Sequence, residues 1–204
     1  DPGDPSRVWL GVENLGLFRS TDGGTSWSWA VQGLKAHTIG TTNSLCFDRF
    51  TSMAMNPTDY HHLCVGLAGR SGTSADALAG AAGVFCSHDD GQTWKQVVGS
   101  GMNTAVTAVG IDGSGQLWAG TAGTPDDQGA YHNDHGVLYT SVDEGATWVE
   151  IDFGMGFVPG MAVRDFQIAP TSPQLMYVAA PIDTSGLQTG TAPAQVGVLL
   201  SADL

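Results

Sequence analysis

Short apolar runs alternate with polar turns along the whole chain, and no stretch keeps the apolar spacing of a helix. Runs of this length, bounded by Gly, Pro, Asn and Asp, are typical of β-strands. One run occurs in four versions, VWLGVEN (8–14), LCVGLAG (63–69), LWAGTAG (117–123) and LMYVAAP (175–181). The pattern therefore predicts an all-β protein built from an internal repeat.

Each repeat contains further strands around that run. A shorter apolar strand follows it, as GLF (16–18), GVF (83–85), VLY (137–139) and GVLL (197–200). An earlier strand precedes it at 52–55, 105–111 and 165–169, and a last strand such as WKQVV or WVEI closes the unit. Four-stranded units of this period are typical of β-propeller blades. We therefore expect four-stranded antiparallel blades arranged radially.

The repeats divide the chain into 1–50, 51–104, 105–163 and 164–204. The first range lacks the first strand of its blade, and the last range lacks the final one. We therefore expect the 204 residues to be one incomplete portion of a ring of about six to eight blades.

An octapeptide follows the third strand of each of the first three repeats, as STDGGTSW (20–27), SHDDGQTW (87–94) and SVDEGATW (141–148). Its Asp can accept hydrogen bonds from turn amides, its Gly can take a positive φ, and its Trp can fold back as an apolar plug. We expect these positions to be structural: Ser20, Asp22, Gly24, Trp27, Ser87, Asp89, Gly91, Trp94, Ser141, Asp143, Gly145 and Trp148.

The pattern S-x-D-x-G-x-T-W resembles the Asp-box, or BNR repeat. This repeat is known in sialidases, in the xyloglucanase family of glycoside hydrolases, in sortilin-type receptors and in a photosystem II assembly factor. The resemblance implies that the boxes lie on the side of the propeller away from the ligand. Trp9 and Trp118 occupy one repeated strand position, where core packing or a sugar-stacking platform are the two interpretations.

The long connections all belong to the opposite face of the predicted propeller. They are 70–83, 124–136 and 181–197, together with the link 32–50 between the first two blades. Elaborated loops on a rigid scaffold are where binding sites usually lie. The predicted binding residues are Tyr131, His132, Asp134, His135 and Arg164.

The loop PDDQGAYHNDH is also the densest cluster of metal-ligating residues. Oxygen ligands favour calcium and imidazoles favour zinc, so a divalent ion such as calcium is one hypothesis and a solvated polar loop is the other. His61 and His62 lie in a turn on the opposite face, apart from this loop. The predicted ligands are Asp126, Asp127, His132, Asp134 and His135.

Two carboxylates stand where the chain enters a first strand near the propeller axis. Glycosidases use paired carboxylates, so Asp48 and Asp165 are the candidate catalytic residues. Each also has an arginine beside it, Arg49 or Arg164, and a local salt bridge is the alternative interpretation.

Charge and cysteines add to this picture. Seven Lys and Arg against twenty Asp and Glu give a net charge of -13, which disfavours nucleic acid and anionic membranes as partners. No run approaches the length of a membrane helix, so we expect no membrane insertion. Cys64 and Cys86 fall on neighbouring predicted strands and form either a disulfide or two buried thiols, and Cys46 is left over.

The sequence favours a non-catalytic, extracytoplasmic propeller that binds a glycan or a protein, or a neighbour in a surface assembly, through its long loops. A glycoside hydrolase is the alternative, of xyloglucanase type or, with less support, of sialidase type. The Arg-Ile-Pro segment typical of sialidases does not occur in the chain.

Overall fold

A computed structural model describes most of the chain. The described residues are 1–12, 15–34, 37–39, 44–47, 49–68, 83–97, 106–122, 137–151, 163, 165–169, 176–181 and 196–201.

The strands form one series of antiparallel sheets, each assembled from strands that follow one another in the sequence. The first sheet contains β1 (Val8–Val12), β2 (Gly16–Ser20) and β3 (Ser28–Trp29). The second contains β6 (Arg49–Met55), β7 (Leu63–Ala68), β8 (Gly83–Ser87) and β9 (Lys95–Gln96). The third contains β10 (Val106–Ile111), β11 (Leu117–Thr121), β12 (Leu138–Ser141) and β13 (Val149–Ile151). The fourth contains β14 (Asp165–Ile168), β15 (Met176–Pro181) and β16 (Val196–Ser201).

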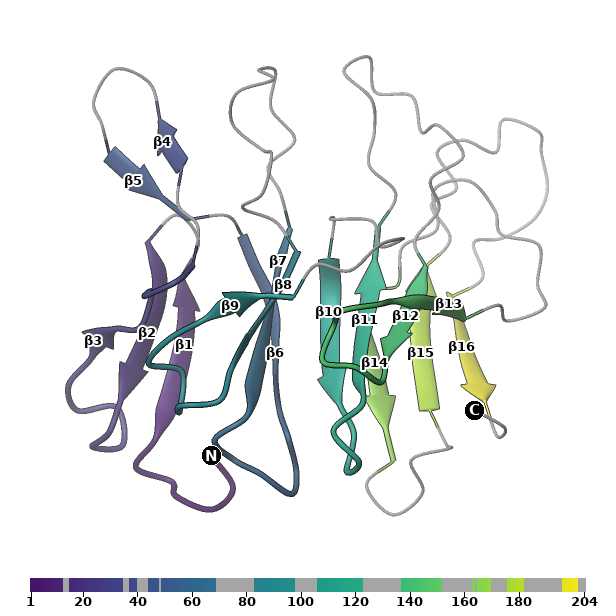
Figure 1. The fold of residues 1–204 in the computed structure, drawn as a ribbon, viewed down its shortest axis with the longest axis horizontal. Coiled ribbons are helices and arrows are strands. Elements are labelled where there is room, and N and C mark those ends of the chain that lie inside the picture. The colour runs from purple at the N-terminus through teal and green to yellow at the C-terminus, as the bar shows by residue number, and fades with distance from the viewer. Residues whose placement is uncertain are drawn as a thin grey trace.

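These sheets stand side by side (Figure 1). The first strands of successive sheets are neighbours, because β10 contacts both β6 and β14. Backbone and side-chain hydrogen bonds join them: Ser52 Oγ accepts from the Val109 amide at 2.7 Å, and Val163 donates its amide to Thr121 O at 3.0 Å. The outermost strand of a sheet is the most exposed, as in β13, whereas β8 and β11 are buried along their whole length. This is the layered arrangement of a β-propeller.

A separate hydrophobic core fills each space between neighbouring sheets. Leu17, Phe85 and Trp94 belong to the core between the first and second sheets. Val109, Tyr139 and Trp148 belong to the core between the second and third, and a further core lies between the third and fourth. A single sheet cannot cover its own apolar faces, so stacking against its neighbours buries them.

One connection has more structure than the sequence predicted. The link 32–50 contains a two-stranded hairpin, β4 (His37–Ile39) and β5 (Ser44–Cys46), where a loop was expected. Its strands are too short to show an alternating pattern, so local sequence carries little signal for them.

All regular elements among the described residues are strands. In that part of the chain, no helix has the length and apolar character needed to cross a membrane.

Candidate functional site

Each octapeptide forms a turn closed by its own side chains. In the second one, Ser87 Oγ donates to Asp89 Oδ1 at 2.7 Å and accepts the amides of Asp89 and Gly91 at 3.2 and 2.9 Å. The same Asp89 carboxylate accepts the amide of Thr93 at 2.8 Å and its hydroxyl at 2.6 Å. The other two turns repeat these bonds with Ser20, Asp22, Gly24 and Ser26, and with Ser141, Asp143, Gly145 and Thr147. Every box carboxylate is therefore occupied inside its own turn.

The hydrogen bonds also shift the acidity of these carboxyl groups. The Ser26 hydroxyl and amide lower the pKa of Asp22 to about 2, and those of Thr147 lower the pKa of Asp143 to about 2. Burial raises the pKa of Asp89, but the bonds from Thr93 and Ser87 outweigh it and leave the pKa below its usual 3.8. All three groups are thus held ionised as hydrogen-bond acceptors, the opposite of what a general acid requires.

The turns need two consecutive residues with positive φ, where the sequence predicted one. Gly91 has φ of 73°, and the residue before it, Asp90, has φ of 60°. Glu144 precedes Gly145 with φ of 55°. Asp90 and Glu144 were not singled out from the sequence, although their place before the box glycine is the signal that could have found them.

The box tryptophans differ in burial. Trp94 is 4% exposed and donates its indole N–H to Ala30 O of the first sheet at 2.9 Å, and Trp148 is 6% exposed. Trp27 is 40% exposed and donates instead to Gly24 O of its own turn. Trp27 thus folds back onto its own turn but stays exposed, because no described sheet packs against that side of the first sheet.

Asp90 reaches from the second sheet to the first, and we call this contact the first junction. Arg7 Nη1 donates to Asp90 Oδ1 at 2.5 Å, and Trp9 Nε1 donates to Asp90 O at 3.3 Å. His61 Nδ1 lies 2.8 Å from the same carboxylate, and Arg19 Nη2 lies 3.9 Å from it. The Arg7 and Asp90 side chains are only 16% and 18% exposed, so the first junction is a largely buried ion-pair cluster.

Glu144 occupies the same place between the second and third sheets, at what we call the second junction. Its partner there is His88, with 3.9 Å between His88 Nε2 and Glu144 Oε2, and both side chains are more than half exposed. The His88 ring stacks on the buried His62 ring with centroids 4.1 Å apart. Burial, followed by the nearby His88, lowers the pKa of His62 and so favours its neutral form.

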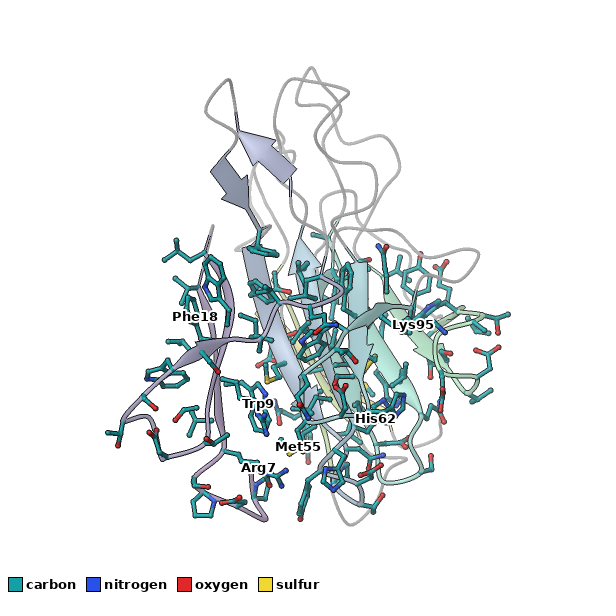
Figure 2. All side chains as sticks on the ribbon, turned by 60° about the vertical axis from the view of Figure 1, so that its left-hand side comes forward. Arg7, Trp9, Phe18, Met55, His62 and Lys95 are labelled. Carbon is teal, nitrogen blue, oxygen red and sulfur yellow. A yellow bond between two sulfur atoms is a disulfide. The ribbon has the colours of Figure 1, made fainter. Side chains whose placement is uncertain are left out.

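The second junction contains open space, whereas ion-paired side chains occupy the first. Two adjoining hollows of about 330 and 510 Å³ share His62, His88 and Glu144 as lining residues. The smaller one also reaches Cys86. Figure 2 shows Arg7, Trp9 and His62 on the lower, box-turn side of the molecule.

A disulfide joins Cys64 to Cys86 beside this hollow. The two residues are directly opposite each other on β7 and β8, which decides between the two alternatives that the sequence left open. The side chain of Cys46 lies outside the described part of the chain.

The disulfide stands at a repeated position. The equivalent opposed pairs are Trp9 with Arg19 on β1 and β2, and Trp118 with Thr140 on β11 and β12. Trp9 is half-buried and carries Arg19 6.0 Å from its ring centre, while Trp118 is buried. The two tryptophans therefore pack between sheets.

Most residues that the sequence predicted for ligand, metal or catalysis lie outside the described part of the chain. Asp165 is described: it is exposed at the start of β14, and its Oδ1 accepts the amide of Phe166 at 2.8 Å. The others are Asp48, Asp126, Asp127, Tyr131, His132, Asp134, His135 and Arg164.

The strand ends nevertheless locate the edge to which the long connections attach. β7 ends at Ala68, β11 at Thr121 and β15 at Pro181. Close to its end, each strand pairs with the start of the strand that follows it in the sequence, or with the residue just before that strand. These ends lie at the edge opposite the box turns (Figure 1). The ends of β7, β11 and β15 therefore share one common edge.

No protein-family model matches the chain, and no curated protein matches it either. Solved structures do. The chain is similar to a GH74 enzyme from Niastella koreensis, with 21% identity, a TM-score of 0.62, and 100% of this chain and 27% of that chain covered. It is also similar to the GH74 xyloglucanase from Xanthomonas campestris, with 19% identity, a TM-score of 0.57, and coverage of 88% and 26%.

A third similar structure is PorZ, a bacterial surface component of the type-IX secretion system of Porphyromonas gingivalis. It is 14% identical, with a TM-score of 0.53 and coverage of 96% of this chain and 24% of PorZ. The chain thus spans about a quarter of the length of each of these proteins. The likeness shows the fold: the chain is a β-propeller portion made of antiparallel sheets.

Proposed function

We propose that the chain is part of an extracytoplasmic propeller that binds a glycan through the edge where β7, β11 and β15 end. The observation that carries this proposal is the contrast between the two edges of the sheets. At the box edge, the turn carboxylates are occupied by their own Ser and Thr residues. The long polar connections predicted from the sequence follow β7, β11 and β15, whose ends lie at the opposite edge.

The similar structures support a carbohydrate ligand more than other classes. Two of them are named as GH74 enzymes, one of these a xyloglucanase, whereas PorZ is a surface component of a secretion system. The resemblance of the turns to the Asp-box agrees with this view, since it places the ligand away from the boxes. Binding without hydrolysis is the form we favour, and a protein ligand is the second form of the same proposal.

The test uses soluble xyloglucan as the probe. We expect the protein to be retarded in a xyloglucan-containing gel, and we expect Tyr131→Ala combined with His132→Ala and His135→Ala to abolish the retardation without lowering the unfolding midpoint. His61→Ala is the matched control, because His61 is an exposed histidine at the box edge. Retardation that survives the triple change but is lost in the control would contradict the proposal.

Hydrolysis is measured on the same samples as newly formed reducing ends. We expect none. Release of reducing ends that disappears in Asp48→Asn or Asp165→Asn would support the alternative, a glycoside hydrolase with these two carboxylates as its catalytic pair.

A calcium-dependent form of the site is tested by chelation. If Asp126, Asp127, His132, Asp134 and His135 hold an ion, chelator should lower the melting temperature and adding calcium should restore it. An unchanged melting temperature would rule that form out and leave the loop as a polar binding surface.

A further inference from the structure

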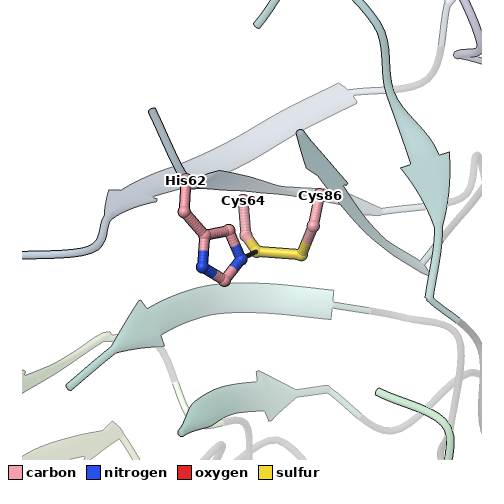
Figure 3. A group of neighbouring side chains, drawn as sticks. All are labelled: His62, Cys64 and Cys86. Atoms are coloured by element: carbon pink, nitrogen blue, oxygen red, sulfur yellow. Dashed lines mark hydrogen bonds between the residues drawn. A yellow bond between two sulfur atoms is a disulfide. The ribbon is translucent and has the colours of Figure 1, made fainter. Parts of the chain in front are cut away.

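Three metal-ligating atoms meet in the wall of the second junction. His62, Cys64 and Cys86 each offer one ligand atom, and these atoms all lie within 4.8 Å of one another. The three residues are 5%, 1% and 4% exposed. Figure 3 shows the His62 imidazole beside the two sulfurs, and its Nε2 lies 3.8 Å from Cys64 Sγ.

The strand register explains why these side chains converge. Cys64 on β7 is directly opposite Cys86 on β8, and opposed residues point to the same face of the sheet. His62 comes two residues before Cys64, so it also shares that face. The backbone of two neighbouring strands therefore fixes all three groups.

The separation of these atoms suits a tetrahedral metal ion. Zinc binds sulfur at about 2.3 Å and imidazole nitrogen at about 2.0 Å, which places a sulfur and a nitrogen ligand about 3.6 Å apart. The distance from His62 Nε2 to Cys64 Sγ is 3.8 Å. The Cα atoms of the two cysteines are 4.1 Å apart, so rotation of the two side chains can separate the reduced sulfurs to about 3.8 Å.

The hollow of about 330 Å³ provides the remaining coordination position. His62 and Cys86 line it together with His88 and Glu144, so water can reach an ion held by the two strands. In the first and third sheets, Trp9 and Trp118 stand where the second sheet has Cys64.

We propose that reduction of the Cys64–Cys86 disulfide creates a binding site for a soft divalent cation such as Zn²⁺, held by two thiolates and the His62 imidazole. This site is independent of the proposed glycan-binding edge. Disulfide and metal are alternative states of one cluster, because a sulfur in a disulfide has no thiolate to donate. An oxidising compartment keeps the site closed, and a reducing one opens it.

The chemistry of opening is a two-electron reduction. A dithiol reductant transfers two electrons and two protons to the disulfide, which becomes two thiols while the reductant becomes a disulfide. Binding of Zn²⁺ then releases the two thiol protons to solvent, and the neutral imidazole adds its Nε2 lone pair.

The test uses Co²⁺ as a spectroscopic probe in protein reduced with a phosphine. Phosphorus supplies the two electrons and becomes a phosphine oxide with oxygen from water, whose protons go to the sulfurs. We expect one Co²⁺ per chain, with thiolate-to-cobalt charge-transfer absorption and the visible bands of a tetrahedral site, both lost when Zn²⁺ is added. Oxidised protein should show neither.

The variants separate a built site from incidental thiol binding. Cys64→Ser or Cys86→Ser should remove the charge-transfer band, and His62→Ala should weaken Co²⁺ binding by about tenfold or more. His61→Ala is the matched control: it is an exposed histidine that faces Asp90 of the first junction and lies outside the ligand set, so affinity should not change.

The proposal is overturned if reduced protein shows no charge-transfer band, if His62→Ala binds Co²⁺ as tightly as the unchanged chain, or if oxidised protein binds it equally well. Circular dichroism follows the fold in parallel. Loss of strand structure on reduction that Zn²⁺ does not restore also overturns it, whereas restoration by Zn²⁺ supports it.

Discussion

The first and second junctions are built from the same positions of the repeat but are held in different ways. At the first, the acidic residue before the box glycine, Asp90, meets two arginines and a histidine in a largely buried cluster. At the second, the corresponding Glu144 has His88 as its ion-pair partner, with both side chains exposed. One junction is filled with charge pairs, and the other retains a hollow beside a disulfide.

The contrast separates two roles within one octapeptide. Its Ser, Asp, Gly and Thr close the turn in the same way in all three copies. The residue before the glycine instead points to the preceding sheet, where Asp90 contacts Arg7, Trp9 and Arg19 and Glu144 contacts His88. The positions of Arg7, Trp9 and Arg19 are occupied in the second sheet by His62, Cys64 and Cys86. The turn is constant, whereas the junction is free to change.

The largest effect should come from the tryptophan that closes the first junction. Trp94→Ala removes a buried indole and its bond to Ala30 O, so we expect a loss of about 3–5 kcal/mol in the free energy of unfolding. Trp27→Ala is the matched variant, and its exposed indole should cost far less. Denaturant unfolding measures both. Equal losses would show that the turn, and not the junction, sets the contribution of a box tryptophan.

A smaller effect should distinguish the two acidic residues. Arg7→Met leaves Asp90 largely buried without its closest cation, and we expect a loss of about 2–3 kcal/mol. Glu144→Gln breaks an exposed contact of 3.9 Å and should change the free energy of unfolding by no more than about 0.5 kcal/mol. The comparison fails if Glu144→Gln proves the more damaging of the two.

The smallest effect should be shared by all boxes and therefore insensitive to the junctions. Asp22 and Asp143 have a pKa near 2 in the folded chain and 3.8 without these hydrogen bonds. Their contribution is fully present above the higher value and is lost as pH falls through the lower one, since the unfolded chain binds protons first. The unfolding midpoint should therefore fall between about pH 4 and pH 2.

The Ser26 and Thr147 side chains supply the matched variants for this prediction. Ser26→Ala removes the hydroxyl that contributes most to the low pKa of Asp22, so the pKa should rise. Thr147→Val should do the same for Asp143. Titration of the Asp carboxylates by NMR would detect either change, and an unaltered pKa would contradict the assignment of these hydrogen bonds.

The repeat made the fold predictable from sequence. Four aligned runs located β1, β7, β11 and β15, and the octapeptide located the turns, because both depend on local chemistry that is repeated in the chain. The hairpin β4–β5 was not predicted, since its strands occur once and are too short for a pattern.

The junctions were less accessible to sequence reasoning. The sequence placed His62 in a turn and gave it no role. Its neighbours in space come from elsewhere in the sequence, because His88 follows another strand and Glu144 belongs to another sheet. The positive φ of Asp90 and Glu144 could be inferred only from their place before the box glycine, since neither residue type favours that region as glycine does. The exposure of Trp27 depends on which sheet lies beside it, and that is not a local property.

The acidic residue before the box glycine also constrains how such a chain can evolve. It lies in one repeat and its partner lies in the preceding one, so each junction is formed by residues from two repeats. Duplication or exchange of a whole repeat carries only half of each pair. Inserting a blade between the first and second sheets would part Asp90 from Arg7, whereas an insertion after the second sheet would part the exposed residues His88 and Glu144. As far as these pairs are concerned, a new blade is accommodated more easily at the second junction than at the first.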